Sequence, residues 1–157
     1  MSIESAKKHL KEYGMDKRVM EFSGSSATVK EAANEIGCKE AEIAKTMSFL
    51  VEEQPIVIVV AGDVKIDNSK YKQEFHKKAK MVPSDELIDI IGHEMGGVGP
   101  FGLNDNVEVY LDESIKRFDH VYPACGSHNS AIKVTIKELE ETTNYKKWVD
   151  VCKLIEE

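Results

Sequence analysis

The chain has 157 residues, of which 41% are hydrophobic and 31% charged, and its formal net charge is −7. This composition is typical of a soluble globular protein, so we expect one domain over residues 1–157 with a single sizeable core. The acidic balance excludes a protein that coats DNA or RNA by charge alone, but it is compatible with a local basic patch.

The first forty residues predict two helices separated by a short strand. Apolar residues at helical spacing between Ile3 and Tyr13 predict an amphipathic helix that ends at Gly14. Arg18–Phe22 is expected to form the strand. Thr28–Glu31 has the capping-box pattern Thr-Val-Lys-Glu, which predicts the start of the second helix.

Two runs rich in apolar and β-branched residues, Lys45–Val51 and Pro55–Ala61, predict a β-hairpin. Ile56–Val60 in the second run does not alternate with polar residues, so we expect a central strand buried on both faces. The longest apolar run, Ile56–Ala61, is too short to span a bilayer, and the N-terminus has no apolar segment typical of signal peptides. We therefore expect a cytoplasmic protein without a membrane partner.

Six lysines gather between Asp63 and Lys80, where three acidic residues stand against them. This local excess has two interpretations. It is either a contact with RNA phosphates, with Lys65, Lys70 and Lys72 as candidate residues, or the solvated face of a helix. Charge alone favours the solvated helix.

The second half of the chain mixes helices and strands. Ser84 is placed to cap a helix over Asp85–Ile91, and a second capping box, Thr135–Glu138, predicts the start of the last helix. The other expected elements are strands over Val107–Leu111, Val121–Ala124 and Ala131–Thr135, and a short helix over Glu113–Phe118. This order predicts an α+β fold, a mixed α/β domain. Its central sheet should be curved and mostly antiparallel or mixed, or a partial barrel, flanked by helices.

The most unusual stretch is Gly92–Gly102, GHEMGGVGPFG, which holds five of the ten glycines. Glycines let a backbone approach a ligand closely, and Pro100 biases the residue before it away from helical geometry. The stretch predicts either a loop that binds a small polar ligand through backbone groups or a long flexible connection.

The remaining chemistry excludes several kinds of site. The glycine loop lacks the pattern of a P-loop, and it follows a predicted helix, which disfavours dinucleotide binding. His93 and Glu94 do not begin an HExxH motif, and three distant cysteines disfavour a disulfide framework or zinc site, so no metal or cofactor is expected. A nucleophile pair of Cys125 and His128 stays open. Lys45 is either a solvated charge on a strand edge or a functional residue.

Three segments taken together resemble the YbaK/EbsC family: Ala44–Thr46 entering a strand, the loop Gly96–Gly102, and the turn Ala124–Gly126 before Ala131–Val134. The family includes free-standing aminoacyl-tRNA deacylases and the editing domain inserted in bacterial prolyl-tRNA synthetases. The resemblance covers nearly the whole chain and implies a mixed α/β domain with a curved central sheet. It also implies hydrolysis of the ester between an amino acid and the 3′-terminal adenosine of tRNA.

The resemblance also implies roles for particular residues. Lys45 corresponds to the family's essential lysine, which makes it the expected catalytic residue. The contributing histidine is His128 by position, with His93 as a rival. The expected substrate-binding residues are Gly96, Gly97, Val98, Gly99, Pro100, Phe101, Gly126 and His128.

We expect a trans-editing deacylase whose small pocket admits alanine, serine, threonine or cysteine and clears them from mischarged tRNA related to tRNA(Pro). Met47 and Phe49 are candidates for the pocket wall, with plain core packing as the equal alternative. The expected partners are the tRNA 3′ end and prolyl-tRNA synthetase or another synthetase, and not DNA. One alternative function is a module that binds aminoacyl-adenosine or an amino acid without turnover, and another is a deacylase of other small esters. No side chain is an obvious general base.

Overall fold

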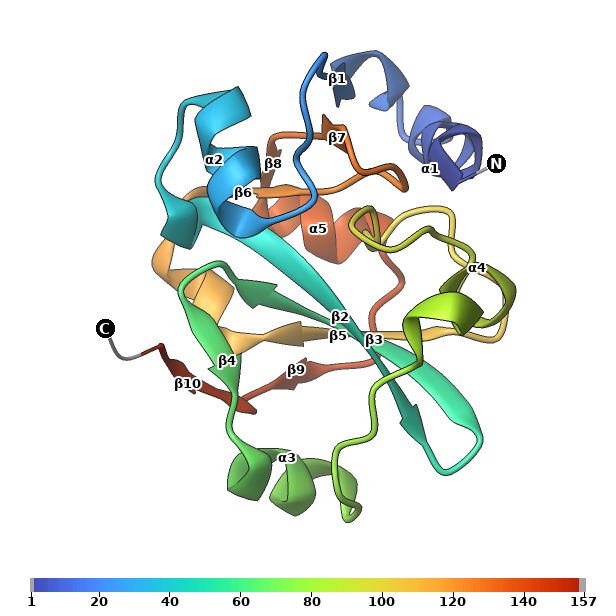
Figure 1. Cartoon of the computed structure of the whole chain (residues 1–157), viewed down its shortest axis with the longest axis vertical. Helices are drawn as coiled ribbons and strands as arrows, with labels where there is room; N and C mark the ends of the chain where they lie inside the picture. The colour runs from blue at the N-terminus through green and yellow to red at the C-terminus, as the bar shows by residue number, and fades with distance from the viewer. Residues whose placement is uncertain (1, 156–157) are drawn as a thin grey trace.

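A curled six-stranded sheet forms the centre of the computed structural model, which describes residues 2–155 (Figure 1). The strand order is β8–β6–β2–β3–β5–β9. At its centre β2 (Ile43–Val51) and β3 (Gln54–Ala61) form the expected antiparallel hairpin, paired from Ala44 with Ala61 to Val51 with Gln54. The outer strands are β5 (Glu108–Asp112), β6 (His120–Pro123), β8 (Val134–Thr135) and β9 (Trp148–Val149).

The sheet is mixed, which is one of the two strand arrangements that the sequence predicted. β6 is parallel to β2, and β5 is parallel to both β3 and β9, whereas β8 is antiparallel to β6. Two small antiparallel sheets accompany the large one. The first joins β1 (Met20–Glu21) to β7 (Ser130–Ala131), and the second joins β4 (Val64–Ile66) to β10 (Cys152–Leu154).

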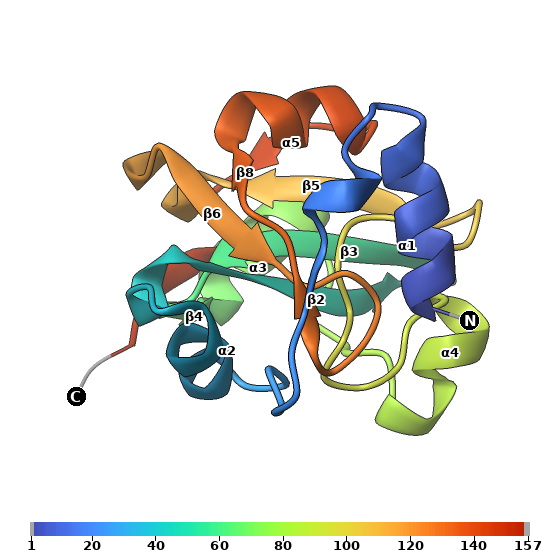
Figure 2. The ribbon, with the colours of Figure 1, turned by 90° about the horizontal axis from the view of Figure 1, so that it is seen from above.

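Helices cover both faces of the sheet. Figure 2 shows α5 (Ile136–Thr142) on one face and α2 (Val29–Ile36) on the other. The other α-helices of the described part are α1 (Ser2–Lys11), α3 (Asn68–Phe75) and α4 (Leu87–Ile90). Because β3 lies between two strands and under helices on both sides, Ile56–Val60 are at most 1% exposed, which confirms the predicted central strand. No helix within residues 2–155 has both the length and the apolar character needed to cross a membrane.

Both predicted capping boxes are present. The Thr28 side chain accepts a hydrogen bond from the Glu31 backbone N–H at 3.1 Å, and the Glu31 carboxylate accepts one from the Thr28 N–H. Thr135 and Glu138 make the same reciprocal pair at the start of α5. Each box satisfies backbone donors that the first turn of a helix leaves without an intrahelical partner, so each fixes where its helix begins.

Other predicted boundaries are wrong. Ser84 does not cap a long helix, because it starts a 3-10 turn, Ser84–Glu86, and α4 is only one turn long. The predicted strand Ala131–Thr135 is split between two sheets. Ala131 belongs to β7, which pairs with β1, whereas Val134 belongs to β8, which pairs with β6. Between them the Ile132 N–H donates to Pro123 O. Arg18–Phe22 contributes only the two-residue β1. The predicted helix Glu113–Phe118 is a 3-10 helix over Glu113–Arg117.

Candidate active site

One stretch of β2 lacks a strand on one side. β6 pairs with Ile43 and Ala44, and further along β2 the Leu50 N–H donates to Lys80 O at 2.9 Å. Between these contacts, among the residues that the structure describes, 45–47 pair with β3 alone. A cavity of about 440 Å³ lies along this open stretch.

The open edge presents backbone groups to the cavity. Ser48 O accepts from Val82 N at 3.1 Å, so the Ser48 backbone points away from β3. Backbone direction alternates along a strand, so the N–H and C=O of Thr46 point toward the same open side. Thr46 itself lines the cavity. A ligand in the cavity therefore meets one free donor and one free acceptor at the strand edge.

Segments that are far apart in the sequence line this cavity. β2 contributes Lys45 and Met47, and the glycine loop contributes Gly96 and Val98. Other lining residues include Ser26, Ala27, Thr28, Met81, Val82, Leu87, Met95, Tyr122, Ala124 and Ser130. The cavity therefore brings Lys45 and the glycine loop together.

Lys45 is the cationic side chain of the cavity wall. Its Nζ donates a hydrogen bond to Val64 O at 2.5 Å, and half of the residue is shielded from solvent. This burial lowers the pKa of Lys45, although the nearby Asp63 carboxylate acts in the opposite direction. An ammonium group has three N–H donors, so the contact with Val64 leaves two for a ligand.

The glycine loop packs against the turn after β6 so closely that side chains do not fit. A Cβ on Gly99 would lie 1.8 Å from Ala124 O, and one on Gly97 would lie 2.5 Å from the Ser127 carbonyl carbon. Contacts this short involve backbone atoms, which cannot move aside as a flexible side chain does. The glycines are therefore required for packing of the loop, which rules out the alternative of a loose connection.

His93 lies inside the loop and is completely buried. Its Nδ1 accepts a hydrogen bond from the Gly99 N–H at 3.1 Å. Burial lowers the pKa of His93 to about 4, so the ring is neutral at pH 7 and keeps the lone pair that Gly99 needs. His93 does not line the cavity, and its hydrogen bond with Gly99 holds the glycine loop in place.

Phe49, an expected wall residue, and Phe101, an expected substrate-binding residue, belong instead to the core. Phe49 is 1% exposed and its ring stacks on Tyr71 with centroids 5.1 Å apart. Phe101 is fully buried and its ring meets the edge of His9 at 5.7 Å. Neither side chain lines the cavity, and both belong to the main hydrophobic core. Gly97, Gly99, Pro100 and Gly126 are likewise not among the lining residues.

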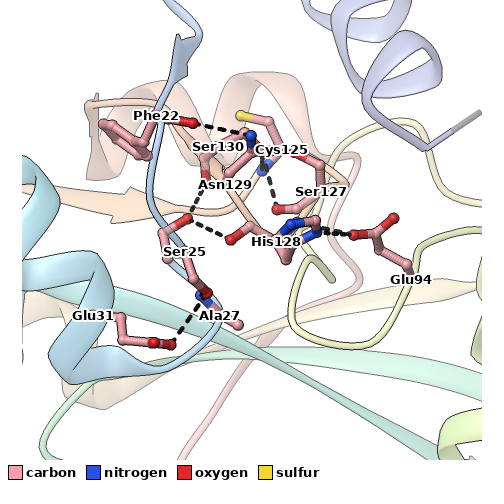
Figure 3. Close-up of polar contacts among 11 residues, drawn as sticks. Phe22, Ser25, Ala27, Glu31, Glu94, Cys125, Ser127, His128, Asn129 and Ser130 are labelled. Atoms are coloured by element: carbon pink, nitrogen blue, oxygen red, sulfur yellow. Dashed lines mark hydrogen bonds and ion pairs between the residues drawn. The ribbon is translucent and has the colours of Figure 1, made fainter.

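The nucleophile pair that the sequence left open is contradicted. Cys125 is fully buried, and this burial raises the pKa of its thiol to about 12, so the thiolate is not available near pH 7. The His128 ring does not face the Cys125 thiol. Figure 3 shows the ring of His128 directed at the carboxylate of Glu94.

Glu94 is the functional candidate that sequence reasoning missed. Its Oε2 lies 2.6 Å from Nδ1 of His128 and 3.1 Å from the backbone N of the same residue. These hydrogen bonds lower the pKa of Glu94, which therefore stays ionised and accepts both. The partners are 34 residues apart. The resemblance named both the glycine loop and the turn after β6, and the structure adds that the two lie side by side.

The lysine-rich segment lies outside this cavity. Lys65 is exposed on β4 and Lys72 is exposed on α3, and neither lines the cavity. Lys70 forms an ion pair with Asp150 at 3.1 Å and lines a separate cavity of about 390 Å³ together with Arg117. Within residues 2–155 no group of three or more His, Cys, Asp or Glu side chains is placed to hold a metal ion.

The fold is that of a small α+β domain with a mixed, curled sheet, and it brings a lysine and a glycine loop to one cavity. A sequence model of the aminoacyl-tRNA editing domain family matches residues 24–142. The chain belongs to this family, and the resemblance drawn from its three segments is confirmed.

Relatives and solved structures agree with this assignment. The protein YwhH of Bacillus subtilis (strain 168), described as uncharacterized, is 52% identical over 154 residues, with 98% of each chain covered. Proline–tRNA ligase of the same organism is 32% identical over 73 residues, which are 46% of this chain and 13% of the ligase. The crystal structure of a proposed trans-editing enzyme for prolyl tRNA synthetase has a TM-score of 0.87 and 27% identity over 97% of both chains.

Proposed function

We propose that the protein is a trans-editing aminoacyl-tRNA deacylase, which hydrolyses the ester of a small mischarged amino acid of the Cys, Ala, Ser or Thr class. One observation carries the proposal: Lys45 and the glycine loop line the same small cavity. Membership of the aminoacyl-tRNA editing domain family supports the editing role. The similarity to proline–tRNA ligase and to a proposed trans-editing enzyme supports a tRNA related to tRNA(Pro) and a synthetase as partner.

In this proposal the aminoacyl group enters the cavity and the terminal adenosine stays at its mouth. The Thr46 backbone holds the substrate, with its C=O accepting from the α-ammonium group and its N–H donating to the ester carbonyl. Lys45 places a positive charge near the developing oxyanion or the ribose and phosphate. Fixed donors of this kind stabilise charge without reorganising during the reaction, and they orient the ester for attack by water.

The cavity wall sets the size of the amino acid that fits. Met47 from β2 and Val98 from the loop are apolar, partly buried and part of the cavity wall, so in this proposal they limit the side chain that enters. A difference of one methylene is worth roughly 1–3 kcal/mol in such a pocket. We therefore expect that a smaller residue in place of Met47 lets larger amino acids enter the cavity.

The experiment is a deacylation panel with alanyl-, cysteinyl-, seryl- and threonyl-tRNA(Pro). We expect the purified protein to release the amino acid from at least one of them and Lys45→Ala to lose this activity. Lys17→Ala, at an exposed lysine that does not line the cavity, is the matched control and keeps it. An untouched panel would refute the deacylase, and small free esters in parallel tell whether tRNA is required.

One observation favours a second candidate, a module that binds aminoacyl-adenosine or an amino acid without turnover. The residues that line the cavity within the described part include no carboxylate and no histidine, the side chains that act most often as general bases. This candidate predicts saturable binding of a non-hydrolysable aminoacyl-adenosine analogue with no release from the true ester.

A further inference from the structure

No histidine lines the cavity, but His128 lies next to one of its lining residues, Gly96. Gly96 and Ala27 line the cavity, and a Cβ on Gly96 would lie 2.8 Å from Ala27 Cβ and 3.6 Å from His128 Cβ. His128 is therefore the next residue outward from the wall. More than half of its side chain is exposed, so the ring lies at the surface next to Gly96 of the wall, on the side from which the proposed substrate enters.

The orientation of this ring is fixed by contacts from two other segments. Glu94, from the glycine loop, accepts from both the ring Nδ1 at 2.6 Å and the backbone N–H at 3.1 Å. Ser26, from the segment before α2, donates its backbone N–H to His128 O at 2.6 Å. An ionised carboxylate only accepts hydrogen bonds, so Nδ1 carries the proton and the free lone pair of the neutral ring is on Nε2.

We propose that His128 is the general base of the deacylation and that Glu94 is the positioning residue that keeps its Nε2 unprotonated and directed outward. The inference rests on the proposed function, and it supplies a proton acceptor for the reaction. The arrangement has the logic of a carboxylate–histidine pair in hydrolases, in which the acid fixes the tautomer and stabilises the imidazolium.

The proposed hydrolysis consumes one water molecule and needs no other co-reactant. Nε2 of His128 takes a proton from water, and the oxygen forms a bond to the ester carbonyl carbon. The tetrahedral oxyanion then collapses, and the bond from the carbonyl carbon to the ribose 3′ oxygen breaks. The leaving oxygen takes the proton back from Nε2, which gives the free amino acid and an intact tRNA 3′ end.

The surroundings of the ring allow a clean test. Glu94 is the charged side chain in contact with the ring, while Ser26 donates its backbone N–H and its hydroxyl to the backbone oxygen of His128. A second histidine–carboxylate pair, His120 with Glu42 at 3.8 Å, does not line the cavity and provides a matched control.

The kinetic test compares single-turnover and steady-state deacylation by the wild type, His128→Gln, Glu94→Gln and Glu42→Gln. We expect His128→Gln to lower kcat about 100-fold and Glu94→Gln about 10-fold with KM little changed, since general bases contribute about 10²–10⁴. The dependence of kcat on pH should differ between the wild type and His128→Gln, because only the wild type carries the imidazole that takes the proton. Glu42→Gln should behave as the wild type.

Nitrogen-15 NMR of the histidine rings gives a readout that does not depend on activity. The wild type should show His128 with the proton on Nδ1, and Glu94→Gln should populate both tautomers while circular dichroism shows an unchanged fold. If the wild type clears esters and both site variants keep its kcat, the base assignment fails and the deacylase proposal stands. If the wild type clears no ester, both fail. An Nε2-protonated ring in the wild type also refutes the assignment.

Discussion

At the scale of single residues, the two histidines next to the glycine loop have opposite environments. His93 is completely buried and accepts from Gly99, whereas His128 is more than half exposed and pairs with Glu94. Sequence reasoning named both as rivals for one role. Only their surroundings in the folded chain separate them: burial gives His93 a structural task, and exposure leaves His128 open to the role that we propose for it.

The buried ring makes the glycine loop sensitive to acid. Burial lowers the pKa of His93 from 6.5 to about 4, so below about pH 6.5 the unfolded chain binds a proton that the folded state does not. Stability is therefore full above that pH and falls as pH decreases toward 4, by up to about 3 kcal/mol. His93→Asn keeps an acceptor near Gly99 but cannot be protonated, so its unfolding free energy should lose this part of the slope. Urea titrations of both proteins between about pH 7 and 4 check it, and parallel slopes would contradict it.

Cys125 provides a second prediction at this scale. Its thiol is buried and its pKa is raised to about 12, so it takes no part in the chemistry. Cys125→Ala should keep the wild-type kcat in the deacylation assay while losing roughly 1 kcal/mol of stability, because one buried group is removed. Iodoacetamide should leave Cys125 of the folded protein unmodified, as peptide mass spectrometry will show. A loss of kcat without unfolding would restore the thiol as a nucleophile.

At the scale of elements, the glycine loop depends on its close packing against the turn after β6. A Cβ on Gly99 would lie 1.8 Å from Ala124 O, so Gly99→Ala must displace the loop, which we expect to cost about 1–3 kcal/mol and most of the activity. Gly24→Ala is the matched control, because its Cβ would meet only the mobile end of the Glu35 side chain. Thermal unfolding and deacylation rates of both variants test this. Equal behaviour of the two variants would show that the close packing does not position the loop.

The elements also show what the sequence can and cannot predict. The capping boxes at Thr28 and Thr135 and the buried strand Ile56–Val60 were predictable, because each depends on residues that are neighbours in the chain. The split of Ala131–Thr135 between two sheets was not, because its pairing partners lie more than a hundred residues earlier or on β6. The same limit hid Glu94, whose importance arises only when the loop meets His128.

At the scale of the whole molecule, a net charge of −7 opposes binding to tRNA, so any favourable contacts must be local. The lysine-rich segment is the obvious source of such contacts. Lys70 is already engaged by Asp150, whereas Lys65 and Lys72 are exposed and have no ion pair within the described residues. If tRNA is held here, the acyl end must reach the cavity on β2 from α3 and β4, and α3 lies at the end of the molecule away from α1 and α2 (Figure 1).

Two double variants of equal net charge separate the effect of net charge from the effect of where the lysines lie. Lys65→Ala with Lys72→Ala should raise KM for aminoacyl-tRNA, leave kcat unchanged, and lower the slope of log KM against log salt by about 1.5, since each lost phosphate contact removes about 0.7–0.9. Lys17→Ala with Lys137→Ala gives the same net charge by removing two exposed lysines elsewhere, and it should change KM far less. A short aminoacyl-adenosine ester should be cleaved equally by all three proteins, because it lacks the phosphates. Equal KM changes in the two double variants would mean that net charge, and not this segment, governs access of tRNA to the cavity.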